Sequence, residues 1–284
     1  NALAVLIHKN DNPGVIKEQT ALSADKNGGV LGGDNPTYHA SIGWDWIPTI
    51  RGRNIGIWND VHLDATGVIT VDDPFVVTRL NLPDTTEASV TMEATLTNHS
   101  DQAVSGTITG RFGKLTVSKE VTINPGAGVP VKFSPEDYRE LIISSPPLWW
   151  PNGYGRQVLQ EAEMSFRVNG NVADSKSFLA GIREMTFAED NGILNLYVNG
   201  RRFVGHGGNW GFPESNLQYR GREFDAAVAY HADMNFTMIR NWVGQIGDDE
   251  FYEACDRHGI MVWQDFWLAN PADGPDPRST AAIL

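Results

Sequence analysis

Alternating hydrophobic and polar positions fill the middle of the chain, from about residue 61 to residue 184. Runs such as SVTMEATLTN, AVSGTITGRF and LQEAEMSFRVNG are short, and Gly, Pro, Asn and Asp residues separate them. A period of two is typical of half-buried strands, and many short strands at this spacing favour an antiparallel β-sandwich. We therefore predict an immunoglobulin-like sandwich over residues 61–184, without the pair of cysteines that antibody domains use.

The pattern after residue 184 mixes helices and strands. ILNLYVNGRRFVG carries an Asn-Gly pair between two alternating runs, which predicts a tight hairpin. A helix is expected from about Arg222 to Met234, and the short apolar strand FTMIR follows it. A second helix is expected between Asp248 and Gly259, and the strand IMVWQ follows that one. This order predicts parallel strands, in either an open doubly wound sheet or a closed (β/α)8 barrel.

Polar and aromatic side chains follow the two predicted parallel strands. Arg240 and Trp242 end the first strand, and Asp265 and Trp267 follow the second. Both candidate architectures bind ligands at the carboxyl ends of parallel strands, so these groups are expected on one rim. The alternative is that Arg240 and Asp265 simply form an ion pair while the aromatic rings fill a loop core. The positions alone leave both possibilities open.

Two further motifs combine tryptophan with groups that form hydrogen bonds. In GHGGNWGFPESN, whose glycine spacing does not fit a dinucleotide-binding loop, Asn209 supplies hydrogen bonds and Trp210 a flat apolar face suited to a sugar ring. In IGWDWIP, Asp45 follows Trp44 and could hold sugar hydroxyls while a ring stacks beside it. Packing is the alternative for both motifs, with Trp210 covering the end of the barrel and the tryptophans around Asp45 serving as structural groups.

Composition and charge narrow the classes of function. A length of 284 residues suggests about two domains, and 41% hydrophobic with 20% charged residues is typical of a soluble protein. We expect no membrane span, because no apolar run approaches the roughly 18 residues that one requires. A formal net charge of −13, with no local cluster of Lys and Arg, disfavours nucleic acid as a partner.

Signals for metals, disulfides and targeting are weak. The seven histidines show no metal-ligand spacing, so we expect no metal site and no cofactor. Cys255 is the one cysteine, which excludes an intrachain disulfide, and its neighbours place it on the apolar side of a helix. The first residues alternate like a strand and lack the plan of a signal peptide, so localisation stays open, with a secreted or periplasmic protein compatible with the sequence.

Several motifs, taken together and in this order, resemble glycoside hydrolase family two. They are GWDWIP, NIGIWNDVHL, PPLWWPNGYGRQVL, VNGRRFVGHGGNW, MNFTMIRNWVGQ, DEFYEACDRHGIMVWQDF and WLANPADGP. The runs GWDW and VWQDF are more similar to β-mannosidases and exo-β-glucosaminidases than to β-galactosidases. The resemblance implies a multidomain, mainly β chain with the end of a jelly-roll sugar-binding domain at 1–60, an immunoglobulin-like β-sandwich at 61–184 and the first βα units of a (β/α)8 catalytic barrel at 185–284.

The resemblance also implies a retaining exo-β-glycosidase, which uses two carboxylates about 5 Å apart. Both catalytic glutamates belong to later barrel strands in the family, so we expect them after Leu284 and none in this chain. Arg240 matches the family arginine that orients the nucleophile, and Trp44 with Asp45 matches a pair that reaches the hydroxyls of the terminal sugar. The expected partners are a carbohydrate substrate and the rest of the chain's own barrel, and the oligomeric state stays open.

Three alternatives remain at this stage. A β-galactosidase or β-glucuronidase of the same family is one, because IRNW and GHGGNW depart from some members and leave the sugar open. A non-catalytic carbohydrate-binding sandwich protein is another, although it would need no βαβ unit. A structural fragment without binding of its own is the third, because a partial barrel leaves strand edges unpaired.

Overall fold

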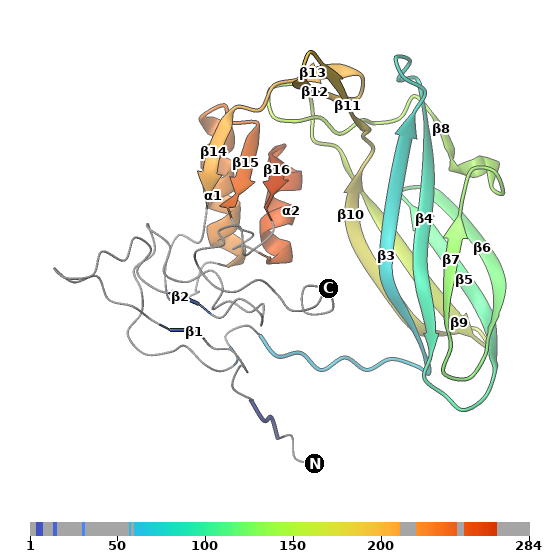
Figure 1. The fold of residues 1–284 in the computed structure, drawn as a ribbon. Helices are drawn as coiled ribbons and strands as arrows, with labels where there is room; N and C mark the ends of the chain where they lie inside the picture. Colours follow the sequence, from blue (N-terminus) through green and yellow to red (C-terminus); the bar gives the residue numbers. More distant parts are fainter. Residues whose placement is uncertain are drawn as a thin grey trace. The chain divides into compact units, whose positions relative to one another are not determined.

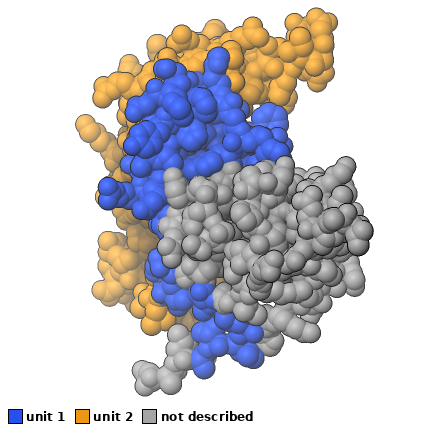
Figure 2. Space-filling view, turned by 90° about the vertical axis from the view of Figure 1, so that its left-hand side faces the viewer, with its two compact units in different colours: residues 1–62, 206–255, 261–284 blue, residues 63–205, 256–260 orange. Residues whose placement is uncertain are grey.

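The computed structural model describes residues 4–7, 14–15, 30–31, 57, 60–210, 220–242 and 247–265 (Figure 1). The chain divides into two compact units, which Figure 2 colours separately. Unit 1 comprises residues 1–62, 206–255 and 261–284, and unit 2 comprises residues 63–205 and 256–260. Trp44, Asp45 and Trp267 lie outside the described residues, as does most of the predicted jelly-roll segment.

The strands of unit 2 up to residue 181 form two antiparallel sheets (Figure 1). One sheet has the order β10-β9-β5-β6, and the other has the order β3-β4-β7 with β8 also paired to β4. The strands are β3 (Ile69–Leu80), β4 (Glu87–Asn98), β5 (Val104–Phe112), β6 (Leu115–Ile123), β7 (Gly128–Phe133), β8 (Ile142–Ser144), β9 (Leu159–Val168) and β10 (Asn171–Gly181), with a 3-10 turn, η2, at Arg139–Leu141 before β8.

A single hydrophobic core joins the two sheets. Strand β4 alternates between buried and half-buried positions along almost its whole length, as the period of two in the sequence predicts. Ile108 and Phe166 from one sheet and Met92 and Phe133 from the other are fully enclosed members of the same cluster. The predicted β-sandwich is therefore confirmed, while its immunoglobulin-like assignment and the boundaries at 61 and 184 stay predictions.

A small three-stranded antiparallel sheet follows in unit 2, made of β11 (Met185–Asp190), β12 (Ile193–Val198) and β13 (Arg201–Phe203). Asn199 and Gly200 connect β12 to β13 with φ angles of +51° and +75°. A two-residue hairpin turn of this kind needs positive φ at both positions, and Asn-Gly is the sequence that adopts it most readily. The predicted tight hairpin is confirmed.

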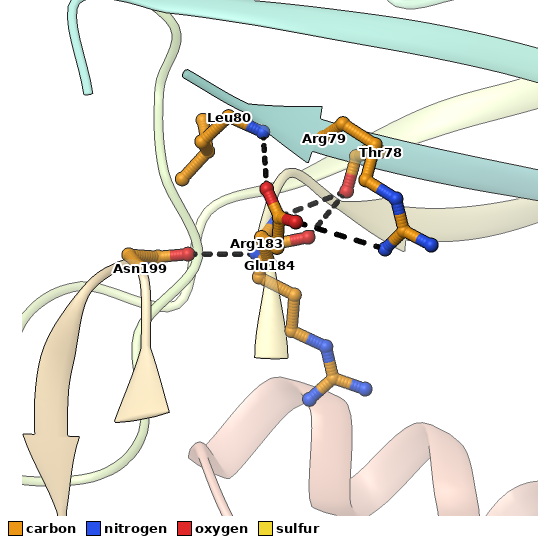
Figure 3. Close-up of polar contacts among 6 residues, drawn as sticks. All are labelled: Thr78, Arg79, Leu80, Arg183, Glu184 and Asn199. Atoms are coloured by element: carbon orange, nitrogen blue, oxygen red, sulfur yellow. Dashed lines mark hydrogen bonds and ion pairs between the residues drawn. The ribbon is translucent and has the colours of Figure 1, made fainter. Parts of the chain in front are cut away.

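Polar contacts tie this hairpin to the end of β3 (Figure 3). The Glu184 carboxylate accepts a hydrogen bond from the Leu80 backbone N–H at 2.6 Å, and the Glu184 N–H donates to Asn199 Oδ1 at 2.9 Å. Thr78 Oγ1 donates to the Arg183 carbonyl oxygen at 2.6 Å. These bonds satisfy backbone groups of the connecting segment, which explains why unit 2 continues through the hairpin to Gly205.

Unit 1 contains a parallel sheet with the order β14-β15-β16 and two helices (Figure 1). Its elements are β14 (Gly207–Trp210), α1 (Gly221–Asp233), β15 (Met238–Asn241), the part of α2 (Asp249–His258) up to residue 255, and β16 (Met261–Gln264), together with a short antiparallel pair, β1 (Gly14–Val15) and β2 (Val30–Leu31). The predicted βαβ order and its parallel strands are confirmed, whereas closure into a (β/α)8 barrel stays a prediction.

The two helices begin and end close to the predicted positions. Helix α2 buries Phe251, Ala254 and Cys255 on one side, so the expected core position of the cysteine is confirmed. Gly259 follows α2 with a φ of +75°, the left-handed conformation that commonly ends a helix. Among the helices that the structure describes, none is long and apolar enough to cross a membrane.

Candidate functional site

The register of the parallel sheet sets which side chains meet at the carboxyl ends of its strands. Asn209 pairs with Arg240, which pairs with Trp263, and one residue further Trp210 pairs with Asn241, which pairs with Gln264. Successive residues of a strand point to opposite faces of a sheet. Asn209, Arg240 and Trp263 therefore share one face, and the row that contains Trp210 lies on the other face.

Trp210 lies on the face that the helices cover. Its ring is 5.4 Å from the ring of Phe251 in an edge-to-face arrangement, 6.3 Å from Phe224 and 5.3 Å from His231. These contacts bury part of the indole between the sheet and the helices α1 and α2 and are favourable geometries for aromatic pairs. The indole thus packs between the sheet and the helices, a position different from the end of the barrel considered from the sequence, and a role of Trp210 toward a sugar stays a prediction.

Arg240 and Asp265 form an ion pair on the opposite face. Arg240 Nε donates to Asp265 Oδ1 at 3.1 Å and Oδ2 at 3.0 Å, and Nη2 lies 2.9 Å from Oδ2. The Arg240 side chain is 43% exposed and that of Asp265 10%. Two adjacent nitrogens of Arg240 bind one carboxylate, which fixes the plane of the guanidinium.

Aromatic rings flank the Arg240 guanidinium. It lies 5.4 Å from the ring centre of Trp242 and 6.0 Å from that of Trp263. Arginine commonly stacks on aromatic faces, which limits its motion without removing its charge. We call Asn209, Arg240, Trp242 and Asp265 the strand-end cluster, because the structure brings these four predicted site residues to one end of the parallel sheet.

A second polar group, which the sequence reasoning missed, joins the first residues of the two helices. Arg220 Nη1 lies 2.7 Å from Asp248 Oδ1, and Arg220 Nε lies 3.2 Å from Glu250 Oε2. Glu250 Oε2 also accepts a hydrogen bond from the Gly221 N–H at 2.9 Å, at the beginning of α1. Arg220, Asp248 and Glu250 therefore connect the beginnings of α1 and α2 to each other.

Asp248 is the buried member of this group. Its side chain is 5% exposed, and burial raises its pKa above the usual range while the Arg220 guanidinium opposes that shift. Replacing Arg220 by methionine is expected to lower the free energy of unfolding of the chain by about 3 kcal/mol, because the carboxylate loses its partner. Asp248→Asn is expected to cost only about 1 kcal/mol, because a neutral amide still accepts a hydrogen bond.

Urea denaturation at pH 7.5 and pH 5 measures both effects. A carboxyl whose folded pKa is raised carries its penalty above that pKa and loses it as protonation neutralises the group. The destabilisation by Arg220→Met should therefore shrink as the pH falls. The cost of Asp248→Asn should instead grow as the pH falls, because protonation relieves the buried carboxyl of the unsubstituted chain and has no effect on an amide. Equal costs for the two variants at both pH values would contradict the role assigned to the buried charge.

Across residues 60–210, 220–242 and 247–265, and the few described residues before them, no three or more His, Cys, Asp or Glu side chains are grouped for metal binding. The charged side chains at the sheet end are arranged as ion pairs instead. Such an arrangement is suited to hydrogen bonding with a polar ligand or with a further carboxylate.

Comparison with known proteins agrees with this architecture. The chain is 34% identical to the mannosylglycoprotein endo-β-mannosidase of Lilium longiflorum. The match covers 96% of this chain and 29% of the lily protein. Residues 69–183, the span of the sandwich strands, match the model for glycosyl hydrolases family 2. The chain belongs to glycosyl hydrolases family 2.

Two further proteins are similar to the chain over most of its length. The chain is 31% identical to an exo-β-D-glucosaminidase of Streptomyces avermitilis, over 85% of this chain and 27% of that protein. The crystal structure of a β-D-mannosidase from Dictyoglomus thermophilum matches with a TM-score of 0.66 and 25% identity, over 84% of this chain and 30% of that one. This family 2 chain thus spans less than a third of the length of the curated relatives named here.

Proposed function

We propose that this family 2 chain is part of a retaining exo-β-glycosidase that hydrolyses terminal β-mannosides or β-glucosaminides. The curated relatives include a β-mannosidase of Rattus norvegicus and an exo-β-D-glucosaminidase of Streptomyces avermitilis, each matched over at least 84% of this chain. The observation that carries the proposal is the Arg240–Asp265 ion pair at the carboxyl end of parallel strands. Enzymes built on parallel strands concentrate their chemistry at that end.

The proposed reaction is a double displacement. A carboxylic acid protonates the glycosidic oxygen while a carboxylate attacks the anomeric carbon, so the bond to the leaving group breaks and a glycosyl ester forms. Water then attacks the anomeric carbon, the first group now accepts its proton, and the ester bond breaks with net retention of configuration. In this proposal both carboxylates belong to the longer protein rather than to these 284 residues, which contribute groups that bind and orient.

Arg240 is proposed to orient the nucleophilic carboxylate and to keep it ionised. A fixed cation within a few ångströms of a carboxyl group lowers the pKa of that group, which favours the attacking form. Asp265 holds Nε and Nη2 of the guanidinium, so the edge that bears Nη1 is presented in a defined direction. The rings of Trp242 and Trp263 near the guanidinium limit its motion further.

The remaining predicted residues are proposed to contact the sugar. Asn209 is exposed at the end of β14 in the same row as Arg240, where its amide can bind a hydroxyl. Trp44 and Asp45 are proposed to reach the hydroxyls of the terminal sugar, as the resemblance implies. Trp210 and Trp267 are proposed as apolar walls, with part of the Trp210 indole already occupied by its packing contacts.

An endo-acting β-mannosidase is the second candidate function. The lily relative, at 34% identity, is named for endo action on mannosylglycoproteins. Exo and endo enzymes of one family can share a reaction and differ in whether the site closes around a terminal sugar. The products distinguish them, because an exo enzyme releases single sugars and an endo enzyme releases longer saccharides.

The longer protein that contains this chain should be assayed with the p-nitrophenyl β-glycosides of mannose, glucosamine, galactose and glucuronic acid. We expect turnover of the mannoside or the glucosaminide at least about 100-fold faster than of the other two, because hydrogen-bonding sites reject substrates that leave polar groups unpaired. Asp45→Ala should remove most of this activity. Activity on the galactoside alone would contradict the proposed substrate class, and release of an intact saccharide from a mannosylglycoprotein without free mannose would favour the endo alternative.

A further inference from the structure

A row of polar side chains lies directly behind the Arg240–Asp265 ion pair, on the face of the sheet that the helices cover. Gln264 Oε1 accepts hydrogen bonds from Asn241 Nδ2 at 2.9 Å and from the Tyr252 hydroxyl at 2.7 Å. Gln264 Nε2 donates to the carbonyl oxygen of Asp265 at 2.9 Å. With donors on its oxygen and an acceptor on its nitrogen, the Gln264 amide has one satisfied orientation.

Both donors to Gln264 keep their hydrogens over the pH range in which glycosidases act. Asn241 is fully buried and does not titrate. Burial raises the pKa of the Tyr252 phenol above its ordinary value of 10.0, and a hydrogen bond with Asn241 only partly opposes this shift. The direction of the hydrogen bonds onto Gln264 is therefore the same from acidic to mildly basic pH.

The same network holds the backbone of Asp265 on two sides. Its carbonyl oxygen accepts from Gln264 Nε2, and its N–H donates to the carbonyl oxygen of Asn241 at 3.3 Å. The direction of a short side chain such as Asp follows from the position of its own backbone. The carboxylate of Asp265 in turn fixes the guanidinium of Arg240. A continuous set of hydrogen bonds thus runs from Tyr252 on α2 to Arg240 on β15.

We propose that Tyr252, acting through Gln264 and Asp265, is a positioning residue that sets the orientation of Arg240 toward the nucleophilic carboxylate. This inference rests on the proposed function of Arg240. Tyr252 touches neither substrate nor the reacting groups in this proposal. Its loss would let the Gln264 amide and the Asp265 backbone shift, and small displacements of a charged group change its interaction with a neighbouring carboxylate.

Tyr252→Phe in the longer protein removes only the hydroxyl. The ring packs edge-on against Phe251 with 5.1 Å between ring centres, so a phenylalanine can keep that contact. We expect kcat to fall about 10-fold with little change in KM, as is typical when an outer partner of a functional group is lost. The acidic limb of the pH profile of kcat/KM should move about half a unit to higher pH, because a less well placed Arg240 stabilises the ionised nucleophile less.

Two further variants make the test decisive. Tyr230→Phe is the matched control, because that ring is 68% exposed on α1, and it should leave kcat and the pH profile unchanged. Gln264→Met keeps the length of the side chain and removes both of its polar groups, so it should have the same effects on kcat and on the pH profile as Tyr252→Phe. It tests the same network independently if the Tyr252→Phe variant fails to fold. Thermal unfolding of every variant shows whether a change in rate accompanies a general loss of stability.

Arg240→Lys in the same assay separates this inference from the proposed function. If Arg240→Lys lowers kcat and moves the acidic limb while Tyr252→Phe and Gln264→Met behave like Tyr230→Phe, the positioning role is wrong and the role of Arg240 stands. If Arg240→Lys changes neither quantity, the proposed role of Arg240 is itself wrong. A lower melting temperature with an unchanged kcat and pH profile for Tyr252→Phe would make the network purely structural and would also overturn the inference.

Discussion

Replacing Arg240 by methionine in the longer family 2 protein is expected to lower kcat/KM for its β-glycoside about 100- to 1,000-fold, the usual cost of removing one fixed donor from a charge-stabilising site. Methionine keeps much of the length of the arginine stem but has no charge and no donor. The loss should appear mainly in kcat, because the interaction with the nucleophile matters most as charge develops in the transition state. Steady-state kinetics on the preferred p-nitrophenyl glycoside measures it.

Two further variants control for this result. Arg222→Met changes an exposed arginine at the beginning of α1 and should leave the kinetics unchanged. Asp265→Asn keeps Arg240 in place with a neutral acceptor, so its loss of kcat/KM should be smaller than that of Arg240→Met. A decrease of less than about 10-fold for Arg240→Met would show that Arg240 forms a structural ion pair with Asp265 and contributes little to the reaction.

The 284-residue chain by itself is expected to hydrolyse none of the four p-nitrophenyl β-glycosides at a measurable rate. A retaining mechanism requires two positioned carboxyl groups, and contacts with the sugar cannot replace them. Glu250 already accepts from Gly221 and pairs with Arg220 at the beginning of α1. Asp265 is committed to Arg240. Both carboxylates thus already have cationic partners in the described structure.

The sandwich and the helical pattern could be predicted because their signals are local and repeated. The 12 residues of β4 alternate between buried and less buried positions almost without interruption, as hydrophobic and polar residues alternate in the sequence. The Asn199-Gly200 turn follows from the positive φ angles that these two residue types tolerate. Helix α2 runs from Asp249 to His258, within the limits expected from Asp248 and Gly259.

The arrangement of side chains at the carboxyl end of the parallel sheet could be predicted only in part. The rule that polar groups gather at strand ends brought Arg240 and Asp265 together correctly, because it depends on topology alone. The face on which Trp210 lies could not be predicted, because β14 has four residues, two of them glycine, and shows no alternation. Its indole packs on residues of α1 and α2 that are distant in sequence.

The supporting polar groups were missed for a related reason. Arg220 and Asp248 are 28 positions apart, and Tyr252 and Gln264 are 12 apart, so no short motif connects them. Tyr252 follows the buried Phe251 on α2, where its hydroxyl has no distinguishing sequence context. The one usable signal was Gln264 itself, an amide at the end of an apolar strand immediately before the candidate residue Asp265.

Covalent trapping tests the central claim most directly, namely that these residues bind and orient while the carboxylates of a retaining family 2 glycosidase lie elsewhere in the longer protein. A 5-fluoro glycosyl fluoride of the preferred sugar, which keeps the substituent at C2 of mannose or glucosamine, should inactivate the longer protein by forming a stable glycosyl ester on its nucleophile, because fluorine slows hydrolysis of the intermediate. Peptide mass mapping should find one labelled glutamate outside residues 1–284, and the 284-residue chain should take up no label. A glycosyl ester on a carboxylate within residues 1–284 would contradict the account.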